Sequence, residues 1–400
     1  MPCKTIRVLH LHDKTSIHGG AEVYISQLQE LLPLHGCETF WIGITELRGC
    51  YVITEFGRGV IKEAKNAGDL FHFLTLYCEK EDIHLINIHN IFNPAIVRFC
   101  FQLRPVVKHV HSPVMVCPGK DKFWRYSEKP CNISYGLHCF WHIYSQGCAN
   151  RHPKRVWNAW NYVKFEINDA ANRYKKIIVM SDFIKQGMME CGVREEQMIC
   201  NPYFTNKIDF VSDNSDQPIK KILFVGRLIS SKGPHIMLGA LTKLLSERND
   251  IQLEIIGDGI MRASLAQVIT DKELNKKVFF RGWLKKEEID KAIGESYMII
   301  FPSIYPEAFG IVGIEAMMQG KPVVGFNVGG VSTWLKNEIT GFLTKPGDTE
   351  MLREKAELLL NDAEIYNRMS RNARSEALKK FVPAVHIGKL IEIYRGSIEK

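Results

Sequence analysis

Several features that would classify a chain at once are missing from this 400-residue sequence. No apolar run approaches the roughly 18 residues of a membrane-spanning helix, and the amino end lacks a signal-peptide core, so we expect a cytoplasmic protein. The eleven cysteines include no CxxC pair. An odd number of cysteines spread over a long chain favours reduced thiols, with at most one metal cluster, over a disulfide framework.

Two families of binding motif are also missing. No GxGxxG follows the first strand-like segment, and no acidic residue after a second strand is placed to contact a ribose, which argues against a dinucleotide-dependent oxidoreductase. The sequence has no helix-turn-helix, RNA-binding aromatic motif or paired-cysteine finger. Nucleic acid is therefore not expected as a partner.

The net charge of +8 comes from one segment. Residues 101–180 carry thirteen Lys and Arg against four Asp and Glu, whereas residues 1–100 carry nine against eleven and residues 181–400 carry thirty against twenty-nine. The same segment holds four of the seven tryptophans. Basic and aromatic side chains together suit anionic lipid headgroups or phosphate-bearing ligands. We expect peripheral contact with the cytoplasmic face of a membrane, with a phosphate-bearing ligand as the alternative.

Strand-like segments occur in two series, separated by the polar tract 211–218. Alternation with helical stretches predicts an α/β protein of two doubly wound, Rossmann-like domains, 1–210 and 211–400, facing a central cleft. The last helix is expected to pack back on the first domain. The first series comprises Thr5–His12, Thr39–Ile44, Ile83–His89, Arg104–Val110 and Lys175–Met180, and the second includes Lys220–Leu228 and Tyr297–Pro302.

The segment PEAFGIVGIEAM, residues 306–317, carries two carboxylates on different predicted elements. Glu307 is expected in a strand-to-helix loop, whereas Glu315 lies within a helix that begins near Gly310. In open α/β sheets such loops bind ligands, and the first N–H groups of the helix form an anion site. A phosphate site is one interpretation, and two solvated surface glutamates are the other.

A second loop, GRLISSKGP, follows the first strand of the second series. It places Arg227 and Lys232 at the same sheet edge as Glu307, with Pro234 suited to the first helical position. Two cations beside a helix N-terminus would bind a diphosphate. The alternative is a pair of solvated surface cations.

These motifs, in their order along nearly the whole chain, resemble those of the family 4 glycosyltransferases of the GT-B fold. The resemblance implies a retaining hexosyltransferase-type enzyme that takes a nucleotide diphosphate sugar, requires no metal for catalysis and binds the donor mainly in the carboxyl-terminal domain. It implies a saccharide, lipid-linked or small-molecule acceptor, as in cell-surface polysaccharide or other glycoconjugate biosynthesis. The matching motifs are GGAE (19–22), HVHSP (109–113), VMSDFIKQ (179–186), NP (201–202), VGRLISSKG (225–233), PEAFGIVGIEAM (306–317) and GG (329–330).

The resemblance also implies roles for individual residues. Arg227 and Lys232 match cations on the leaving diphosphate, and Glu307 matches an acid that holds donor-sugar hydroxyls. Glu315 matches an acid that holds the ribose, and His111 matches a histidine whose main-chain carbonyl or ring stabilises positive charge on the sugar. His111, Glu307, Arg227 and Lys232 are thus the predicted catalytic residues, and Gly19, Gly20, Phe309, Gly310 and Ile311 match backbone contacts to the diphosphate. His89 and His109 are weaker candidates, since strand histidines are more often core residues.

One segment, 117–148, departs from the family pattern because it holds four cysteines. A structural zinc or iron–sulfur site at Cys117, Cys131, Cys139 and Cys148 is one interpretation, and buried or reduced thiols are the other. The helix expected over Pro153–Ile167 places Val156, Trp160, Val163 and Ile167 on one face, which should pack in a core, with lipid contact as the alternative. A nucleotide-sugar epimerase of GT-B fold and a non-catalytic nucleotide-sugar-binding module remain alternative functions.

Overall fold

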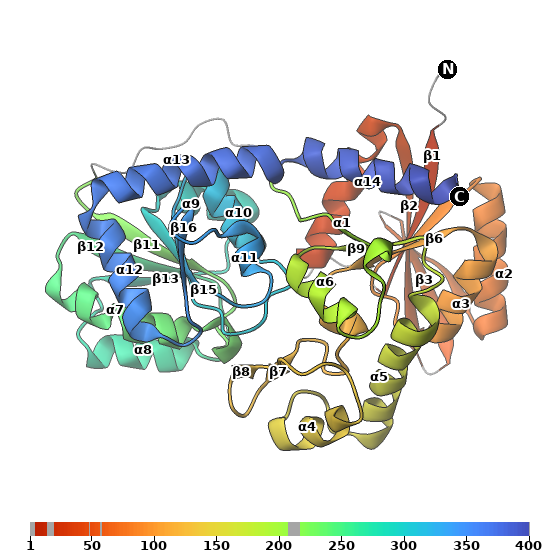
Figure 1. Ribbon diagram of the computed structural model, residues 1–400, viewed down its shortest axis with the longest axis horizontal. Coiled ribbons are helices and arrows are strands. Elements are labelled where there is room, and N and C mark those ends of the chain that lie inside the picture. The colour runs from red at the N-terminus through yellow and green to blue at the C-terminus, as the bar shows by residue number, and fades with distance from the viewer. Residues whose placement is uncertain (1–4, 14–19, 48, 57, 207–216, 400) are drawn as a thin grey trace. The chain divides into compact units, whose positions relative to one another are not determined.

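The computed structural model describes residues 5–13, 20–47, 49–56, 58–206 and 217–399 (Figure 1). The chain divides into two compact units. Unit 1 contains Met1–Asp121, Asn132–Tyr203 and Pro383–Lys400, and unit 2 contains Lys122–Cys131 and Phe204–Val382. The predicted domain boundary at 210/211 and most of the polar tract 211–218 lie outside the described residues.

Unit 1 is built on an eight-stranded sheet with the order β10-β9-β6-β5-β1-β2-β3-β4. Six strands, from β10 to β2, pair in parallel, and β3 and β4 extend the β2 edge as antiparallel strands. Sequence reasoning missed β3, β4 and β10; β4 buries one of its six residues, so it lacks the apolar pattern of the others. The bounds are β1 (Ile6–His12), β2 (Cys37–Leu47), β3 (Cys50–Glu55), β4 (Gly59–Ala64), β5 (Leu85–Ile88), β6 (Val106–Val110), β9 (Lys176–Val179) and β10 (Met198–Cys200).

Polar caps begin several helices of unit 1. The side chains of Asn66, Asn93 and Ser181 accept hydrogen bonds from N–H groups in the first turns of α2, α3 and α6, the positions where a helix leaves its donors unpaired. The last helix, α14, belongs to this unit and contacts α1, β5 and β6. The helices are α1 (Gly20–Leu31), α2 (Ala67–Lys80), α3 (Pro94–Leu103), α4 (His138–Gln146), α5 (Pro153–Phe165), α6 (Asp182–Met189) and α14 (Pro383–Ile398).

Unit 2 is built on a six-stranded parallel sheet with the order β13-β12-β11-β14-β15-β16 (Figure 1). This order reverses direction between β11 and β14, which is the switch point where doubly wound sheets bind ligands. The predicted α/β architecture with two parallel sheets is confirmed. The strands are β11 (Lys220–Val225), β12 (Ile251–Ile256), β13 (Val278–Gly282), β14 (Met298–Phe301), β15 (Val323–Phe326) and β16 (Gly341–Thr344).

The helices of unit 2 follow its strands in alternation, and a short hairpin from the first third of the chain joins the unit. In the hairpin, β7 (Phe123–Trp124) pairs with β8 (Lys129–Pro130). Within the described part of the chain, no helix is both long and apolar enough to cross a membrane. The helices are α7 (Pro234–Glu247), α8 (Arg262–Asp271), α9 (Lys286–Glu295), α10 (Ile311–Met318), α11 (Val331–Trp334), α12 (Thr349–Asn361) and α13 (Ala363–Lys380).

Candidate functional site

Two loops of unit 2 meet at the switch point of its sheet. The loop after β11 carries Arg227 and Lys232, and the loop after the neighbouring β14 carries Glu307. Gly233, with φ of +68°, lets the loops approach, because a Cβ at this position would lie 2.0 Å from the carbonyl oxygen of Pro302. The backbone therefore holds Lys232 against the Glu307 loop.

Lys232 and Glu307 form an ion pair at this edge. The Lys232 ammonium donates a hydrogen bond to Oε1 of Glu307 and lies 5.5 Å from the centre of the Tyr305 ring. Ser303 donates from its hydroxyl to the same carboxylate oxygen at 2.8 Å. Glu307 is buried, whereas about a quarter of the Lys232 side chain stays exposed, so an incoming anion could reach the ammonium.

A third loop fixes the backbone of Glu307. It follows β15, and its Gly330 N–H donates to the Glu307 carbonyl oxygen at 2.7 Å. At the preceding Gly329, which has φ of +53°, a Cβ would lie 2.3 Å from the same oxygen. The GG pair of the sequence motif thus serves a close backbone approach that a larger residue would block.

The helix α10 begins directly beside Glu307, as the sequence predicted. Its N-cap is Gly310 in a left-handed conformation with φ of +95°, and Phe309 before it accepts a hydrogen bond from the Trp334 indole at 2.7 Å. The first-turn N–H groups at Ile311 and Val312 have no partner earlier in the helix. This end of α10 therefore directs donors and the positive end of the helix dipole into the loop region.

Glu315 has a different partner from Glu307. It lies inside α10, is buried, and pairs with the ammonium of Lys286 at 2.9 Å. Burial raises the pKa of the Glu315 carboxyl, and the charge of Lys286 opposes part of that effect. The two glutamates of the motif therefore hold separate cations on separate elements.

Arg227 lies in the same loop as Lys232 but is exposed. The neighbouring Leu228 anchors the loop, since its N–H donates to the Asp258 carbonyl at 2.9 Å. The structure thus places Arg227 at the switch-point edge with a side chain that can move toward an anion.

In unit 1, His111 follows β6 and both nitrogens of its ring are engaged. Nδ1 is 2.6 Å from the Tyr203 hydroxyl, and Nε2 is 2.8 Å from Nδ1 of His89. Burial, together with His12 and Lys108, lowers the pKa of His111 to about 3, so the ring is neutral at pH 7. The resemblance offered two groups of His111, its ring and its main-chain carbonyl. Because both ring nitrogens are engaged, the carbonyl is the group that is left to contact a sugar.

His111 belongs to a cluster of buried rings that includes both weaker candidates, His89 and His109, but the sequence did not predict that these rings contact one another. Nδ1 of His10 is 3.1 Å from Nε2 of His89, and the rings of His109 and His111 stack with centroids 4.9 Å apart. Burial lowers the pKa of His10, His89 and His109. These residues come from the carboxyl ends of β1, β5 and β6, so the cluster forms a neutral wall at one edge of the sheet. Contacts across such long sequence separations leave no local signal.

The amino-terminal glycine motif is described only in part. Gly19 lies outside the described residues, and Gly20 is the first residue of α1, which follows β1 along the chain.

The predicted metal site at Cys117, Cys131, Cys139 and Cys148 is not supported. Among the described residues, no group of three or more His, Cys, Asp or Glu is placed to hold a metal ion. The structure thus favours the other interpretation, in which these four cysteines are reduced thiols.

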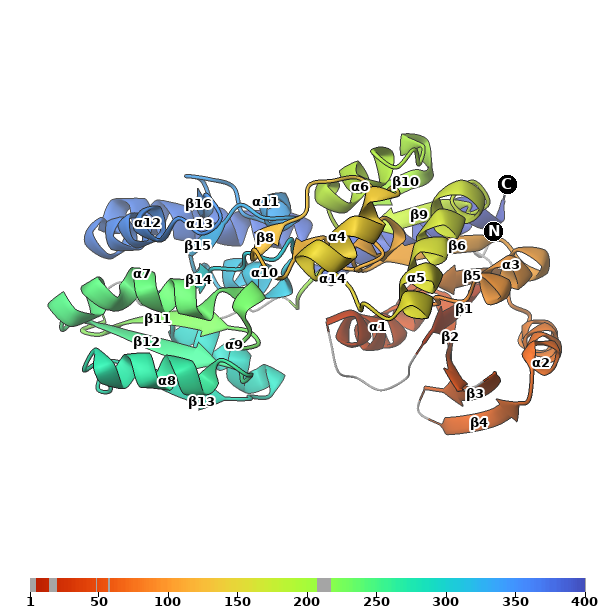
Figure 2. The same cartoon turned by 90° about the horizontal axis from the view of Figure 1, so that it is seen from below.

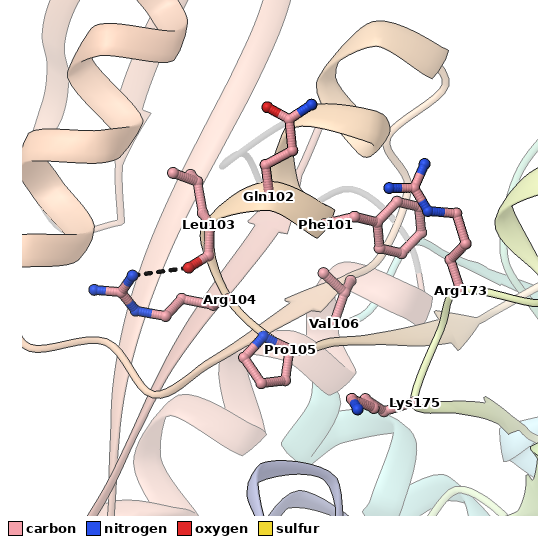
Figure 3. Close-up of a pocket in the computed structure, with 8 residues that line it drawn as sticks. All are labelled: Phe101, Gln102, Leu103, Arg104, Pro105, Val106, Arg173 and Lys175. Carbon is pink, nitrogen blue, oxygen red and sulfur yellow. Dashed lines mark hydrogen bonds between the residues drawn. The ribbon is translucent and has the colours of Figure 1, made fainter. Parts of the chain in front are cut away.

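A pocket of about 370 Å³ lies at the opposite end of the unit 1 sheet, where β6 and β9 begin (Figure 3). It contains no predicted site residue. Arg104 at its rim donates to the Leu103 and Ile83 carbonyl oxygens at 2.8 and 2.6 Å, so this cation serves the backbone. We therefore place the candidate site at the unit 2 switch point.

Comparison with solved structures bears on the fold. The chain superposes on a glycosyltransferase from Rickettsia africae with a TM-score of 0.72 and 16% identity, over 100% of both chains. It superposes on HepE of Anabaena, solved with UDP and glucose, with a TM-score of 0.65 and 18% identity, over 97% of this chain and 98% of that one. At such identities the likeness shows the fold, and the predicted GT-B fold is confirmed.

Sequence comparison matches part of the chain to a known family. Residues 206–376 match the family described as "Glycosyl transferases group 1". An uncharacterized glycosyltransferase of Methanocaldococcus jannaschii is 30% identical over 209 residues, 52% of this chain and 53% of the relative. Alpha-D-kanosaminyltransferase of Streptomyces kanamyceticus is 32% identical over 180 residues, 45% of this chain and 46% of the relative. The match spans about half the length of these curated relatives. The matched segment, residues 206–376, contains the whole unit 2 site and is similar to the group 1 glycosyltransferases.

Proposed function

We propose that the protein transfers a sugar from a nucleotide diphosphate sugar to an acceptor hydroxyl, with retention at the anomeric carbon. The observation that carries this proposal is the ion pair of Lys232 and Glu307 at the switch point of the unit 2 sheet, beside the N-terminus of α10. Cation, carboxylate and helix donors lie there in the segment that matches the family. Such an edge suits a diphosphate and the sugar attached to it.

Donor binding would rearrange this ion pair. A diphosphate carries more charge than one carboxylate and would draw the Lys232 ammonium to itself, with Arg227 and the N–H groups of Gly310 and Ile311 as further contacts. The released Glu307 carboxylate can then accept hydrogen bonds from sugar hydroxyls. A uridine nucleotide sugar is the first donor to test, because HepE of Anabaena was solved with UDP-glucose.

The chemical step follows from where charge develops. As the bond from the anomeric carbon to the diphosphate oxygen breaks, negative charge grows on phosphate, where Lys232 and Arg227 stabilise it. The acceptor oxygen attacks the face that the diphosphate leaves, and its proton passes to the departing phosphate oxygen. The resemblance assigns the His111 carbonyl to the positive charge on the sugar ring, and it assigns Glu315 to the ribose.

The acceptor is proposed to be a saccharide, a lipid-linked saccharide or a small molecule, bound by the amino-terminal half in the cytoplasm. The step uses no nucleophilic carboxylate, and the family resemblance implies no metal. Donor affinity should therefore survive a chelator.

A panel of nucleotide sugars, read by thermal shift with and without EDTA, tests the proposal. A donor at 100 times its dissociation constant adds about 2.7 kcal/mol to the free energy of unfolding. We expect one donor class to raise the melting temperature, and the Lys232→Ala variant to lose that rise. The proposal fails if no nucleotide sugar shifts the melting temperature, or if EDTA abolishes the shift.

A further inference from the structure

The helix α4 of unit 1 presents apolar side chains to solvent. Leu137, Trp141 and Tyr144 are 75%, 73% and 46% exposed, and their spacing of four and three residues puts them on one stripe. The inward side of α4 holds Ile143, which is 1% exposed. Helices of globular proteins normally keep polar residues on the outer face, so this stripe reverses the usual pattern.

The helix α5 lies beside α4 (Figures 1 and 2), and its side chains extend the apolar surface. Trp157 is 57% exposed, and its ring stacks on Phe140 of α4 with centroids 6.4 Å apart. The ring of Trp160 lies 5.3 Å from Phe140 and joins the two helices beneath. We call Leu137, Trp141, Tyr144 and Trp157 the aromatic face.

Charge of one sign accompanies the aromatic face. Residues 132–165 contain four Lys and Arg and no Asp or Glu. The four cations are all exposed: Arg151, Lys154, Arg155 and Lys164. The side chains of Tyr144 and Arg151 each donate to the other residue's main-chain carbonyl oxygen at 3.1 Å, so Arg151 borders the aromatic face directly. The Lys164 ammonium lies 5.5 Å from the ring centre of the underlying Trp160.

We infer that the aromatic face docks on an anionic membrane surface, with its Trp and Tyr rings at headgroup depth. Trp and Tyr prefer this zone, since their rings are apolar and their N–H or O–H groups can stay hydrated. Each Lys or Arg near an anionic leaflet adds about 1 kcal/mol of attraction at moderate salt. The inference is independent of the proposed chemistry, because it rests on unit 1 surface residues outside the candidate site.

The surface differs from the one that periodicity singled out. Val156 and Val163 are 3% and 1% exposed, whereas Trp160 and Ile167 of the same predicted face are half-buried, so this face packs in the core only in part. The exposed Trp157 points elsewhere, next to α4.

A second copy of the chain suits the aromatic face less well than a membrane. A two-fold dimer places the same patch on both sides, so the four cations of one copy would face the four of the other. Like charges across an interface disfavour association, whereas anionic lipids neutralise them.

The test is co-sedimentation with sucrose-loaded vesicles. One set contains phosphatidylcholine alone, and the other contains phosphatidylcholine with phosphatidylglycerol. We expect the full-length protein to sediment with the anionic set and to be released by high salt, which screens exposed charges beyond about 3 Å at 1 M. Trp141→Ala with Trp157→Ala, and separately Lys154→Glu with Arg155→Glu, should each lower the partition coefficient roughly tenfold or more.

Matched controls come from unit 2. Trp283 is 71% exposed, and Lys272 and Lys276 are exposed, so Trp283→Ala and Lys272→Glu with Lys276→Glu repeat the chemistry elsewhere. These variants should bind anionic vesicles within about twofold of the parent, because the substituted residues are not part of the aromatic face. Thermal melts confirm that each variant is folded.

Three results would overturn the inference. Equal sedimentation with neutral and anionic vesicles would remove the charge argument. An unchanged partition coefficient in both variants of the aromatic face would exclude this face as the membrane-binding surface. An equal loss of binding in the control variants would exclude it as well. Light scattering that shows a dimer abolished by Trp141→Ala with Trp157→Ala, without vesicle binding, would assign the face to self-association.

Discussion

The two sheets carry opposite chemistry at their carboxyl edges. In unit 2 the edge holds paired charges, Lys232 with Glu307 and Lys286 with Glu315, and part of each cation is exposed. In unit 1 the corresponding edge holds stacked histidine rings such as His89 and His109, which are 1% exposed. Both units alternate strands and helices, so the difference comes from side chains at the strand ends.

This difference teaches what each edge can do. In a charge pair that reaches solvent, the cation can exchange its carboxylate partner for an anionic ligand. Water hydrates both charges during the exchange, so the free-energy cost is small. Neutral rings held by mutual hydrogen bonds cannot respond in this way, because protonating one of them would bury an uncompensated charge. We therefore expect the charged edge of unit 2 to bind an anionic ligand. We expect unit 1 instead to lose stability when acid protonates its buried rings.

Breaking the buried charge pair of unit 1 by removing one of its two charges should have the largest effect. Lys108 on β6 is 3.3 Å from Oε1 of Glu166, and both side chains are buried. The hydroxyls of Tyr162 and Tyr174 also donate to this carboxylate, at 2.5 and 3.0 Å. Glu166→Gln keeps the volume but leaves the Lys108 ammonium uncompensated, so unit 1 should lose about 3–5 kcal/mol of stability.

Hydrogen exchange at β5 and β6 measures this loss, with β11 and β14 of unit 2 as internal reference. The matched control is Glu195→Gln, which breaks an exposed pair with Lys185 and should leave exchange unchanged. Equal protection of β6 in Glu166→Gln and the parent would show that the pair does not hold unit 1 together.

The next largest effect should come from the charged edge of unit 2. Glu307→Ala should lower kcat by on the order of 10²–10³, the loss seen when one preorganised electrostatic contact is removed. Arg227→Ala should behave similarly, because it too acts on charge that grows in the transition state. Steady-state kinetics, with folding checked by thermal melts, would decide.

Tyr203→Phe removes the hydroxyl that contacts Nδ1 of the His111 ring. If the carbonyl of His111 is the active group, this variant should keep kcat within a few-fold of the parent.

The third prediction concerns acid. Burial lowers the pKa of His111 to about 3 and of His386 to about 4, whereas an unfolded chain binds the proton near pH 6.5. The stability that these neutral rings contribute is present above pH 6.5 and is lost as pH falls toward the folded values. For each of the two rings, the free energy of unfolding of unit 1 should fall by about 1.4 kcal/mol for each pH unit of acidification in this window.

Exchange measured between pH 7 and pH 5, corrected for intrinsic rates, should show β5 and β6 losing protection faster than β11 and β14. A His386→Gln variant should have a shallower slope. Equal slopes in the two units would remove the contrast between them.

The smallest effect separates the two glutamates within unit 2. Glu315→Ala should raise the donor KM about tenfold with little change in kcat, because a contact to the ribose is equally strong in ground and transition states. A kcat loss as large as that of Glu307→Ala would contradict the assignment of Glu315 to the ribose.

Local sequence pattern predicted the parts of the site that depend on local structure. The β-branched run before Pro302 and the helical spacing after Gly310 placed Glu307 in a loop and Glu315 in a helix, and the structure has both. The partner of Glu315 was not predictable, because Lys286 lies 29 positions away on another helix. The same holds for Tyr24 and His386, which are 362 positions apart and share a hydrogen bond of 2.7 Å.

Spacing alone could not decide between the two interpretations of the four cysteines. A metal site needs side chains that converge in three dimensions, and among the described residues no such group is found. The outward aromatic stripe of α4 was hidden for another reason. Periodicity shows which residues share a face, and only packing shows whether that face is turned inward.

The helix α14 has a consequence for synthesis. It packs on β5 and β6 of the first sheet, where Asn87 donates to the buried Tyr394 hydroxyl at 2.7 Å, and its His386 contacts Tyr24 of α1. Domains usually fold in the order in which they emerge from the ribosome. When residues up to 203 have emerged, however, unit 1 still lacks the part of its core that α14 supplies. Unit 2 has all its segments once residue 382 has emerged, so it can finish before unit 1 does. A fragment ending at residue 203 should aggregate or recruit chaperones, whereas a circular permutant that fuses α14 ahead of β1 should free unit 1 from this delay.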